Sequence, residues 1–466
     1  MKKQTIYRFF TLVAAPLLLA SCFAAKEYER PEEVISDLNY RTDMLPQDST
    51  NVTLISWNEL FTDPVLQELI QEGLQENIDI RVALEQIKAA QAYFKQGKLG
   101  YFPTLTGTGQ YTHQDLSSNS QFGSQFSSLD VFQLSGSLSW EADIWGKIRS
   151  NKRAYAASYL QTVEAHKAVK TALIANIASS YFQLLALDEQ LRVTEETIET
   201  RSSSLETTKA LKEAGNVTEV GVKQTEAQLY TAQALRLDIL KQIRLLENSL
   251  SILLGKEPGA IERGNLMDQK ITTPLKTGVP AELLSNRPDV MASEFNLLNA
   301  FELTNVARSN FYPSLTLTAT GGFQSLEFDK LFDSSSLFST IVAGLTQPIF
   351  NGRQIRTKYE VAQATQEQAK LQFRSALLTA TQEVSDALYS YEIATEKLEV
   401  KKNEFEAYDL ATNYSEELLD NGLVNYLEVL TARQNALSSS LDLIDTHFNQ
   451  LQAIVDLYEA LGGGWQ

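Results

Sequence analysis

Side chains that commonly carry catalysis or bind metals are scarce in this sequence. A single cysteine in 466 residues excludes a disulfide or a multi-thiolate metal site within one chain. The three histidines, His113, His166 and His447, are far apart and show no metal-ligand spacing. Neither a glycine-rich phosphate loop nor a nucleophile elbow is present. The sequence therefore predicts no catalytic residue, no metal site, no cofactor and no enzyme activity.

Basic charge and long apolar runs are also in short supply. Aspartate and glutamate number 58 against 40 lysines and arginines, so no basic excess is available to bind a nucleic acid. After Cys22 no stretch approaches about 18 uninterrupted apolar residues, the length that indicates a transmembrane helix. Any part of the mature chain that spans a membrane is therefore expected to do so in a closed β-barrel.

The first residues have the pattern of a bacterial lipoprotein signal. Basic residues precede an apolar run from Phe9 to Leu19, which is too short for a membrane span of about 20 residues. Small residues then lead into Cys22, as at a signal-peptide cleavage site. We expect Cys22 to be lipidated (palmitate among its acyl chains) and to anchor the mature protein to the outer membrane. The alternative is an ordinary signal peptide with a cysteine nearby by chance.

The remaining sequence consists of two similar halves. Lys98–Leu105 (KLGYFPTL) resembles Arg308–Leu315 (RSNFYPSL), and farther on Gly215 matches Gly422. Repeats of this kind indicate a duplicated structural unit. Each half is expected to contain a medium helix, two strands, a very long helix, a turn and a second medium helix.

Strict alternation of apolar and polar residues identifies the strands. Residues 132–140 and 315–323 place Leu, Phe and Trp on one face and mostly Ser, Thr and Gln on the other. That pattern fits a barrel wall between lipid and water. A soluble β-sandwich strip packed on helices is the alternative. Weaker strands are expected near 105–111 and 341–349, with polar loops at 113–130 and 325–337.

Helical periodicity dominates elsewhere. Residues 146–212 contain no proline and would form a helix of ~100 Å. Medium helices at about 76–101 and 219–254 could stack end to end beside it. A coiled-coil repeat of seven residues is visible in Leu430, Leu437, Ile444, Leu451 and Tyr458. The expected pairs suit the wall of a tunnel, although periodicity alone also allows a plain antiparallel bundle.

Four strands cannot close a membrane barrel, because about eight is the smallest number known and open edges are not tolerated in lipid. Two copies would give eight strands and an interior filled by side chains. Three copies would give twelve strands and leave a water-filled duct. The sequence therefore predicts a trimer.

Four local sequences carry a resemblance to a known family. They are Trp57–Ala83 (WNELFTDPVLQELIQEGLQENIDIRVA), Trp140–Arg149 (WEADIWGKIR), Val279–Glu294 (VPAELLSNRPDVMASE) and Asn310–Gly322 (NFYPSLTLTATGG). In this order, together with the repeat and the lipoprotein signal, they resemble the TolC-like outer membrane factor family. Within it the chain is similar to the lipoproteins that serve RND-type efflux pumps.

The resemblance implies a fold that is mixed but mostly α. Its protomer is internally duplicated, with four transmembrane strands and long coiled-coil helices. Three protomers would form a twelve-stranded barrel in the outer membrane, continuous with an α-helical barrel in the periplasm. The expected divisions are 1–21 (signal peptide), 22–75 (anchored segment and part of an equatorial collar), 76–255 (first repeat), 256–286 (equatorial linker), 287–462 (second repeat) and 463–466 (tail, flexible because of Gly462–Gly464).

The implied function is a passive exit duct for drugs, detergents, bile salts or metal ions. Its partners would be a periplasmic adapter, an inner-membrane RND-type transporter and outer-membrane lipid, but no nucleic acid. Two alternatives remain: a channel for polypeptides exported by an ABC transporter, and a lipid-anchored coiled-coil scaffold without a channel.

Two groups of residues are candidates for the function of such a duct. A periplasmic gate is predicted at Glu428, Asp420, Thr431 and Arg433, since relatives carry carboxylate rings just after the second turn. At the two positions where some relatives have Asp, this sequence has Glu428 and Thr431, and Asn425 with Glu428 also forms a helix-capping pattern. Adapter contact is predicted at the two turns, with Gly215 and Gly422 expected to close the long helices. The turn residues are Gly215, Asn216, Val217, Thr218, Asn421, Gly422, Leu423 and Val424.

Overall fold

The structure is a computed structural model that describes residues 25–31, 56–121, 123, 125, 127–269 and 287–463; the side chain of Asp420 is outside this description. The signal peptide, Cys22 and much of the expected equatorial linker therefore lie outside the described residues. The chain divides into two compact units, which we call the sheet unit and the helical unit. The sheet unit comprises Met1–Pro31, Ile87–Thr162 and Ser293–Phe373, and the helical unit comprises Glu32–Gln86, Val163–Ala292 and Arg374–Gln466.

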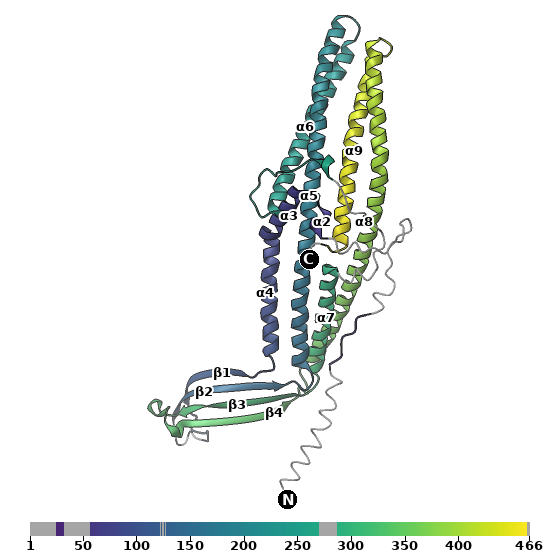
Figure 1. Cartoon of the computed structure of the whole chain (residues 1–466). Helices are drawn as coiled ribbons and strands as arrows, with labels where there is room; N and C mark the ends of the chain where they lie inside the picture. Colours follow the sequence, from purple (N-terminus) through teal and green to yellow (C-terminus); the bar gives the residue numbers. More distant parts are fainter. Residues whose placement is uncertain are drawn as a thin grey trace. The chain divides into compact units, whose positions relative to one another are not determined.

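The helices repeat in number and length, as the sequence predicts (Figure 1). The first half runs α4, β1, β2, α5, α6 and the second runs α7, β3, β4, α8, α9. Within the described residues α4 and α7 have 22 residues each, α5 and α8 have 67, and α6 and α9 have 35. The bounds are α2 Trp57–Leu60, α3 Pro64–Glu76, α4 Ile78–Leu99, α5 Lys147–Glu213, α6 Glu219–Leu253, η4 Leu266–Asp268, α7 Pro288–Ser309, α8 Gln354–Asp420 and α9 Tyr426–Ala460. No helix in these ranges is both long and apolar enough to cross a membrane.

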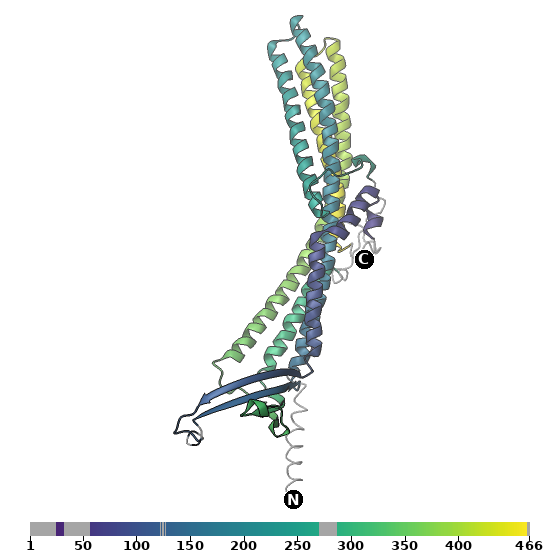
Figure 2. The same ribbon diagram turned by 90° about the vertical axis from the view of Figure 1, so that its left-hand side faces the viewer.

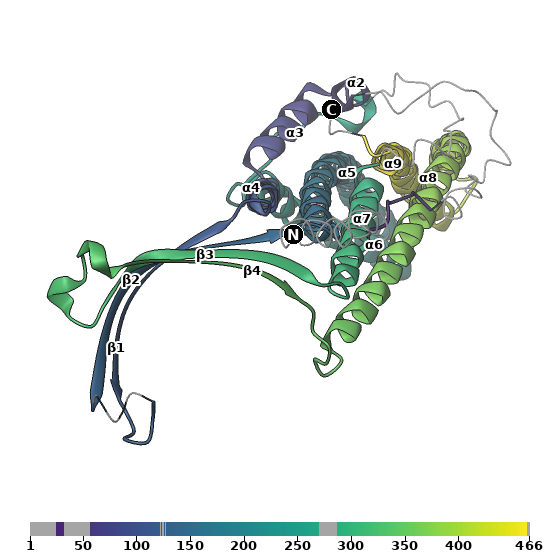
Figure 3. The same ribbon diagram turned by 90° about the horizontal axis from the view of Figure 1, so that it is seen from below.

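The sheet unit contains one antiparallel sheet in which the strands are neighbours in chain order (Figure 3). The strands are β1 (Thr104–Asp115), β2 (Ser128–Ala142), β3 (Ser314–Ser325) and β4 (Leu337–Thr346). Strands β2 and β3 join the two halves of the repeat, with Leu138 opposite Ala319. Because β1 and β4 each pair on one side only within the described chain, both keep a free backbone edge.

The first hairpin extends farther than predicted. Part of the expected loop 113–130 belongs to the strands, because β1 continues to Asp115 and β2 begins at Ser128. Asp130 accepts a hydrogen bond from the Tyr111 hydroxyl at 2.8 Å and bonds to the His113 ring at 2.7 Å. These cross-strand bonds hold the ladder together although the residues are polar. The second loop, expected at 325–337, contains two short 3₁₀ helices, η6 (Phe328–Lys330) and η7 (Ser334–Ser336).

In the helical unit, two short helices end against the residue that precedes another helix. The end of α6 contacts the residue before α4, and the end of α9 contacts the residue before α7, at equivalent places in the repeat. The Asn77 side-chain amide donates to the Leu253 carbonyl, at the end of α6, at 2.9 Å. Arg287 donates in the same way to the Ala460 carbonyl, at the end of α9, at 2.7 Å. Both bonds satisfy a carbonyl that has no partner inside its own helix. The contacts support the predicted end-to-end stacking of the shorter helices.

Glycine closes both of these junctions. Gly255 and Gly462 have φ angles of 71° and 72°, and each follows its helix by two residues. A Cβ at Gly255 would lie 2.5 Å from the Glu76 carbonyl oxygen, closer than atoms can approach. Gly462 and Gly463 are therefore not part of a flexible tail as expected: Gly462 packs on Arg287, and the Gly463 carbonyl accepts a bond from Thr171. Close packing of the chain against the next helix is the reason.

The core of the helical unit confirms the predicted heptads. Every seventh residue of α9 from Leu430 onward is buried. The last three, Ile444, Leu451 and Tyr458, share a cluster with Ile177, Tyr181 and Leu184 of α5. Figure 2 shows α5 beside α6 and α8 beside α9 as antiparallel pairs. The buried heptad residues are Leu430, Leu437, Ile444, Leu451 and Tyr458.

A polar network pins the described start of the linker to this core. Arg263 forms ion pairs with Asp188 and with Glu247, the latter at 2.6 Å. The buried Tyr181 hydroxyl donates to Asp63 at 2.7 Å and accepts from the Gly264 amide at 3.0 Å. Burial raises the pKa of Tyr181, so the phenol stays protonated and keeps this donor role. The linker is thereby a packed part of the helical unit as far as Gln269.

We predict that Gly255→Ala destabilises the protein more than Gly215→Ala does. Both glycines have positive φ angles, of 71° and 80°, so alanine is strained at either position. Only at Gly255 would the new Cβ also overlap backbone, because nothing lies within 4 Å at Gly215. The extra loss in unfolding free energy should be ~1–3 kcal/mol. Urea unfolding followed by circular dichroism measures it, and equal losses would contradict the packed junction.

Candidate functional site

The two turns of the helical unit are built alike. Gly215 and Gly422 adopt φ angles of 80° and 70° and close the long helices, as predicted. The amide of Asn216 donates to the Leu211 carbonyl at 2.9 Å, and the amide of Leu423 donates to the Leu418 carbonyl at 2.9 Å. These bonds are the signature of the Schellman motif, which satisfies the last carbonyls of a helix. Both turns therefore have a fixed backbone.

The helices that leave the turns are capped by side chains. Thr218 accepts a bond from the Gly221 amide at 3.4 Å, so its hydroxyl serves the start of α6. Asn425 accepts from the amides of Leu427 and Glu428 at 2.9 and 3.3 Å and caps α9. The Thr218 hydroxyl therefore serves to cap α6, although Thr218 was predicted to contact the adapter.

Apolar side chains are exposed next to these rigid turns. Leu423 is 72% exposed and Leu427 is 56% exposed on the second turn, and Val220 is 65% exposed on the first. Val217 and Val424 are half-buried. The sequence prediction included Leu423 but missed Val220, although its place two residues after a helix cap was a usable signal. Exposed apolar groups on a rigid backbone are suited to a protein contact.

The gate candidates occupy different environments. Glu428 is exposed, and its carboxylate has no bonding partner among the described residues. The hydroxyl of Thr431 donates to the Leu427 carbonyl at 2.9 Å, within its own helix. Asp420 is the last residue of α8, and its side chain lies outside the described part of the structure. Of the predicted gate residues, Glu428 therefore retains a free charged group.

Arg433 links three helices of one protomer. From α9 it forms an ion pair with Glu416 on α8 at 2.7 Å. It also donates a hydrogen bond to the Ser204 hydroxyl on α5. The guanidinium therefore joins the α8–α9 pair to the first long helix.

Arg201 makes a second link beside the first, and sequence reasoning did not find it. It is 3% exposed on α5 and donates to the Gln228 carbonyl at 2.6 Å and to Gln434 Oε1 at 2.9 Å. Its Nε has no hydrogen-bond partner among the residues that the structure describes. Burial lowers the pKa of Arg201, and the nearby charge of Arg433 lowers it further. The signal was present, because Arg201 continues the buried stripe of Thr194 and Ile198 at helical spacing.

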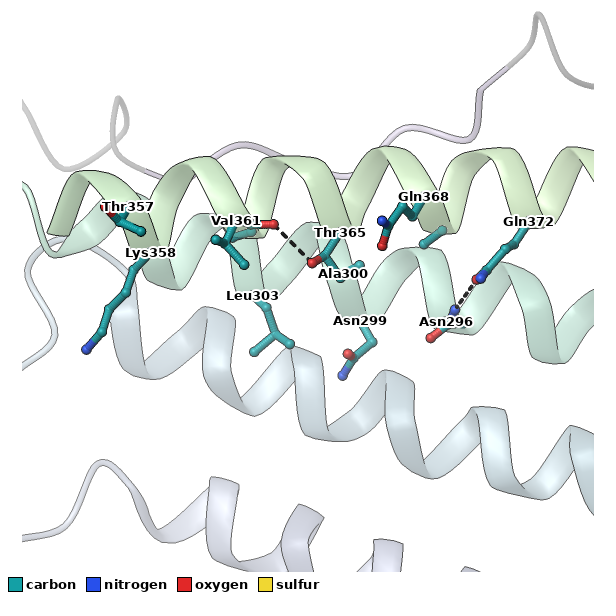
Figure 4. A pocket seen from close by; sticks show the side chains of 12 residues that line it. Asn296, Asn299, Ala300, Leu303, Thr357, Lys358, Val361, Thr365, Gln368 and Gln372 are labelled. Atoms are coloured by element: carbon teal, nitrogen blue, oxygen red, sulfur yellow. Dashed lines mark hydrogen bonds between the residues drawn. The ribbon is translucent and has the colours of Figure 1, made fainter. Parts of the chain in front are cut away.

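A groove in the sheet unit lies between α7 and α8 (Figure 4). Its volume is about 460 Å³. Amides, hydroxyls, aliphatic groups and Lys358 line it, but no carboxylate, histidine or cysteine does. That lining offers no acid–base pair for catalysis. Representative lining residues are Asn296, Asn299, Leu303, Val361 and Gln368.

The histidines form no site within the described chain. No group of three or more His, Cys, Asp or Glu side chains there could hold a metal ion. Burial lowers the pKa of His166 and of His447, and Lys170 contributes at His166. Both imidazoles are therefore mostly neutral at pH 7.

Comparison with known families identifies one whose model covers most of the chain. The family described as "Outer membrane efflux protein" matches twice, over residues 69–256 and 279–463. The toluene efflux pump outer membrane protein TtgF of Pseudomonas putida is 29% identical and covers 97% of this chain and 96% of its own length. The cation efflux system protein CusC of Escherichia coli is 27% identical, with 97% of both chains covered.

Solved structures have the same fold. A membrane protein from Pseudomonas aeruginosa superimposes with a TM-score of 0.86 at 26% identity, covering 95% of this chain and 97% of its own. A CusC structure gives a TM-score of 0.82 at 25% identity, covering 94% and 99%. The protomer fold expected from the sequence, mostly helical and internally duplicated with four strands and long paired helices, is confirmed.

We predict that the partly buried bond between Arg201 and Gln434 couples α5 to α9 more strongly than an exposed bond between the same helices does. A double-mutant cycle with Arg201→Met and Gln434→Met should give a coupling energy of ~1.5–3 kcal/mol, as for hydrogen bonds to charged groups. Gln190 and Asp445, 2.6 Å apart and exposed, form the control pair. Their coupling should stay below ~1 kcal/mol. Additive losses at Arg201 and Gln434 would argue against the link.

Proposed function

Because this chain belongs to the outer membrane efflux protein family and shares the fold of its trimeric channels, we propose that it is the exit duct of a tripartite efflux system. The observation that carries the proposal is the pair of rigid turns with exposed Leu423, Leu427 and Val220. A duct with no further partner would gain nothing from apolar groups held at its helix ends. The turns are instead suited to meet an adapter in the periplasm.

The sheet supports assembly from three copies. Strands β1 and β4 have free edges within the described chain, and such edges are costly in a membrane. Three sheets joined edge to edge would give a barrel of twelve strands. The helical pairs of the three protomers would continue this duct into the periplasm.

The cargo is a class of small molecules, such as drugs, detergents, bile salts or metal ions. Names of the relatives, which include a toluene efflux and a cation efflux component, support this class. An inner-membrane RND-type transporter would drive transport and pass the cargo on through the adapter. The chain itself would conduct passively, catalyse no reaction and need no cofactor.

Lipidation at Cys22 is part of the proposal. The signal pattern before Cys22 supports a diacylated first residue on the mature chain. A barrel and a lipid anchor together would hold the protein in the outer membrane, and the helical unit would extend into the periplasm.

Photocrosslinking tests the partner assignment. A photoreactive residue at Asn216 or Asn421, both exposed in the turns, should capture an RND-type adapter in cells. The same residue at Asn403, exposed on α8 away from the turn, should not. Mass spectrometry identifies the captured protein. Capture of an adapter from an ABC-driven secretion system would replace the efflux function with polypeptide export, and capture of no adapter would favour a scaffold without a channel.

A second prediction concerns the gate. Three copies of Glu428 and Asp420 would form carboxylate rings that narrow the duct and attract cations. The double substitution Glu428→Ala with Asp420→Ala should therefore raise the resting conductance in planar bilayers and the detergent sensitivity of cells. The Asn425 cap survives, because it binds the backbone amide of residue 428. Glu406→Ala, an exposed site on α8, is the control. Unchanged conductance in an assembled double mutant would remove the gate assignment.

A further inference from the structure

The segment Ala25–Pro31, which we call the strap, lies in the sheet unit along α7. Lys26 contacts Asn305, Tyr28 contacts Phe301 and Arg30 contacts Glu294. The strap therefore runs antiparallel to the helix. Its half-buried side chains are Ala25, Tyr28 and Pro31, one in every three. That period is typical of an extended polyproline II ribbon with one face against a surface.

Asn305 holds the strap by its backbone. Its side-chain oxygen accepts from the Lys26 amide at 3.1 Å, and its side-chain nitrogen donates to the Lys26 carbonyl at 3.0 Å. One amide thus satisfies both backbone groups of a single residue. Asn305 is 1% exposed with the strap in place, so both bonds are shielded from water.

Neighbouring charges fix the orientation of that amide. Glu302, also 1% exposed, accepts from the Asn305 nitrogen at 3.3 Å and from Arg153 at 3.4 Å. Arg308 donates to the Asn305 oxygen at 3.4 Å. The donor and acceptor ends of Asn305 are therefore set before the strap binds. We call Glu294, Phe301, Glu302 and Asn305 the seat.

The seat exists in one half of the repeat only. Helices α4 and α7 have equal length and correspond with an offset of 210 residues, from Ile78 to Pro288. The positions in α4 that correspond to the seat are Leu84, Gln91, Ala92 and Lys95. Leu84 cannot repeat the ion pair of Glu294, and Lys95 cannot repeat the two-sided amide contact of Asn305. Both halves of the repeat therefore contain this helix, but only α7 carries the seat.

The beginning of the strap lies beside the junction of strand and helix. A Cβ at Gly146 would lie 3.2 Å from the Cβ of Ala25. Gly146 is in the turn between β2, which ends at Ala142, and α5, which begins at Lys147. Cys22 stands three residues before Ala25 in the sequence, with Phe23 and Ala24 between them, and a chain of three residue steps spans at most ~10 Å.

We propose that the seat on α7 is a binding site for the chain's own lipidated N-terminus, and that the seated strap sets the depth of the lipid anchor relative to the sheet. This inference rests on the proposed lipidation of Cys22. The acyl chains would enter the membrane next to the junction between the strands and the helices. The strap thereby acts as a spacer of fixed length between the lipid surface and the helices.

Limited trypsin digestion of the full-length mature protein in lipid bilayers tests the seat. Lys26 offers a cleavable bond in the strap, whereas the bond after Arg30 is resistant because Pro31 follows. In the seated strap the Lys26 backbone is bonded to Asn305, so cleavage requires release. Asn305→Ala should speed cleavage after Lys26 on the order of tenfold, since two hydrogen bonds are lost. Asn296→Ala, on the same helix but bonded to Gln372, should leave the rate unchanged.

A charge swap guards against misfolding of the Asn305 variant. Arg30→Glu places two carboxylates together at Glu294 and should also speed cleavage. Adding Glu294→Arg restores an ion pair of reversed sense and should return the rate toward that of the natural protein. Cleavage that is equally fast in the natural protein and in every variant would overturn the seat.

The spacer role and the lipidation have separate readouts. The mass of the released Cys22–Lys26 peptide shows whether Cys22 carries acyl chains, and an unmodified peptide would remove the lipid from the proposal without affecting the seat. Deleting Phe23 and Ala24 shortens the reach by ~7 Å. In bilayers this deletion should speed cleavage severalfold, but in detergent it should not. Equal rates in bilayers and in detergent would overturn the spacer role.

Discussion

Helix ends leave backbone carbonyls without partners, and the architecture of the helical unit depends on how they are satisfied. At the turns the last carbonyls are bonded within a Schellman motif, and the chain reverses there. At the other ends of the short helices, Asn77 and Arg287 reach from the start of the next helix and take the carbonyls of Leu253 and Ala460. The same requirement acts on the sheet, where the free edges of β1 and β4 call for further copies. Unmet backbone bonds thus explain both the stacked helices and the need for further copies of the chain.

Links between the helix pairs are polar, in contrast to the apolar heptads within them. Arg201 and Arg433 are close together, and Glu416 balances only one of the two charges. Buried charge of this kind contributes less to stability than an apolar core does, but it favours one arrangement over others. The two arginines therefore suit a place where helix pairs must hold one position and still be able to separate. That property agrees with the gate proposed in the same region, at Glu428.

Most of the fold could be predicted from the sequence, because repetition and periodicity are properties of the chain alone. The long helix ended one residue from its predicted end, and the heptad residues of α9 are all buried. The resemblance to outer membrane factors was also correct. What failed depended on contacts between distant residues. Asp130 extended the first hairpin through Tyr111 and His113, and Arg287 gave Gly462 a packed place instead of a flexible one. Arg201 was missed because its role depends on hydrogen bonds to Gln228 and Gln434, which lie on other helices.

Comparison of the two halves of the repeat distinguishes residues that build the fold from the candidate functional residues. Residues that build the framework occur in both halves: Gly215 with Gly422, Gly255 with Gly462, and the caps Thr218 with Asn425. The candidate functional residues do not. Tyr408 stands where the second half would repeat Arg201, while Glu226 and Gly221 stand where the first half would repeat Arg433 and Glu428. The seat for the strap is likewise confined to α7. A trimer of such chains would have six similar helix pairs around its axis but only three sets of charged links. The two halves therefore share one framework and differ in the charged contacts that this framework holds.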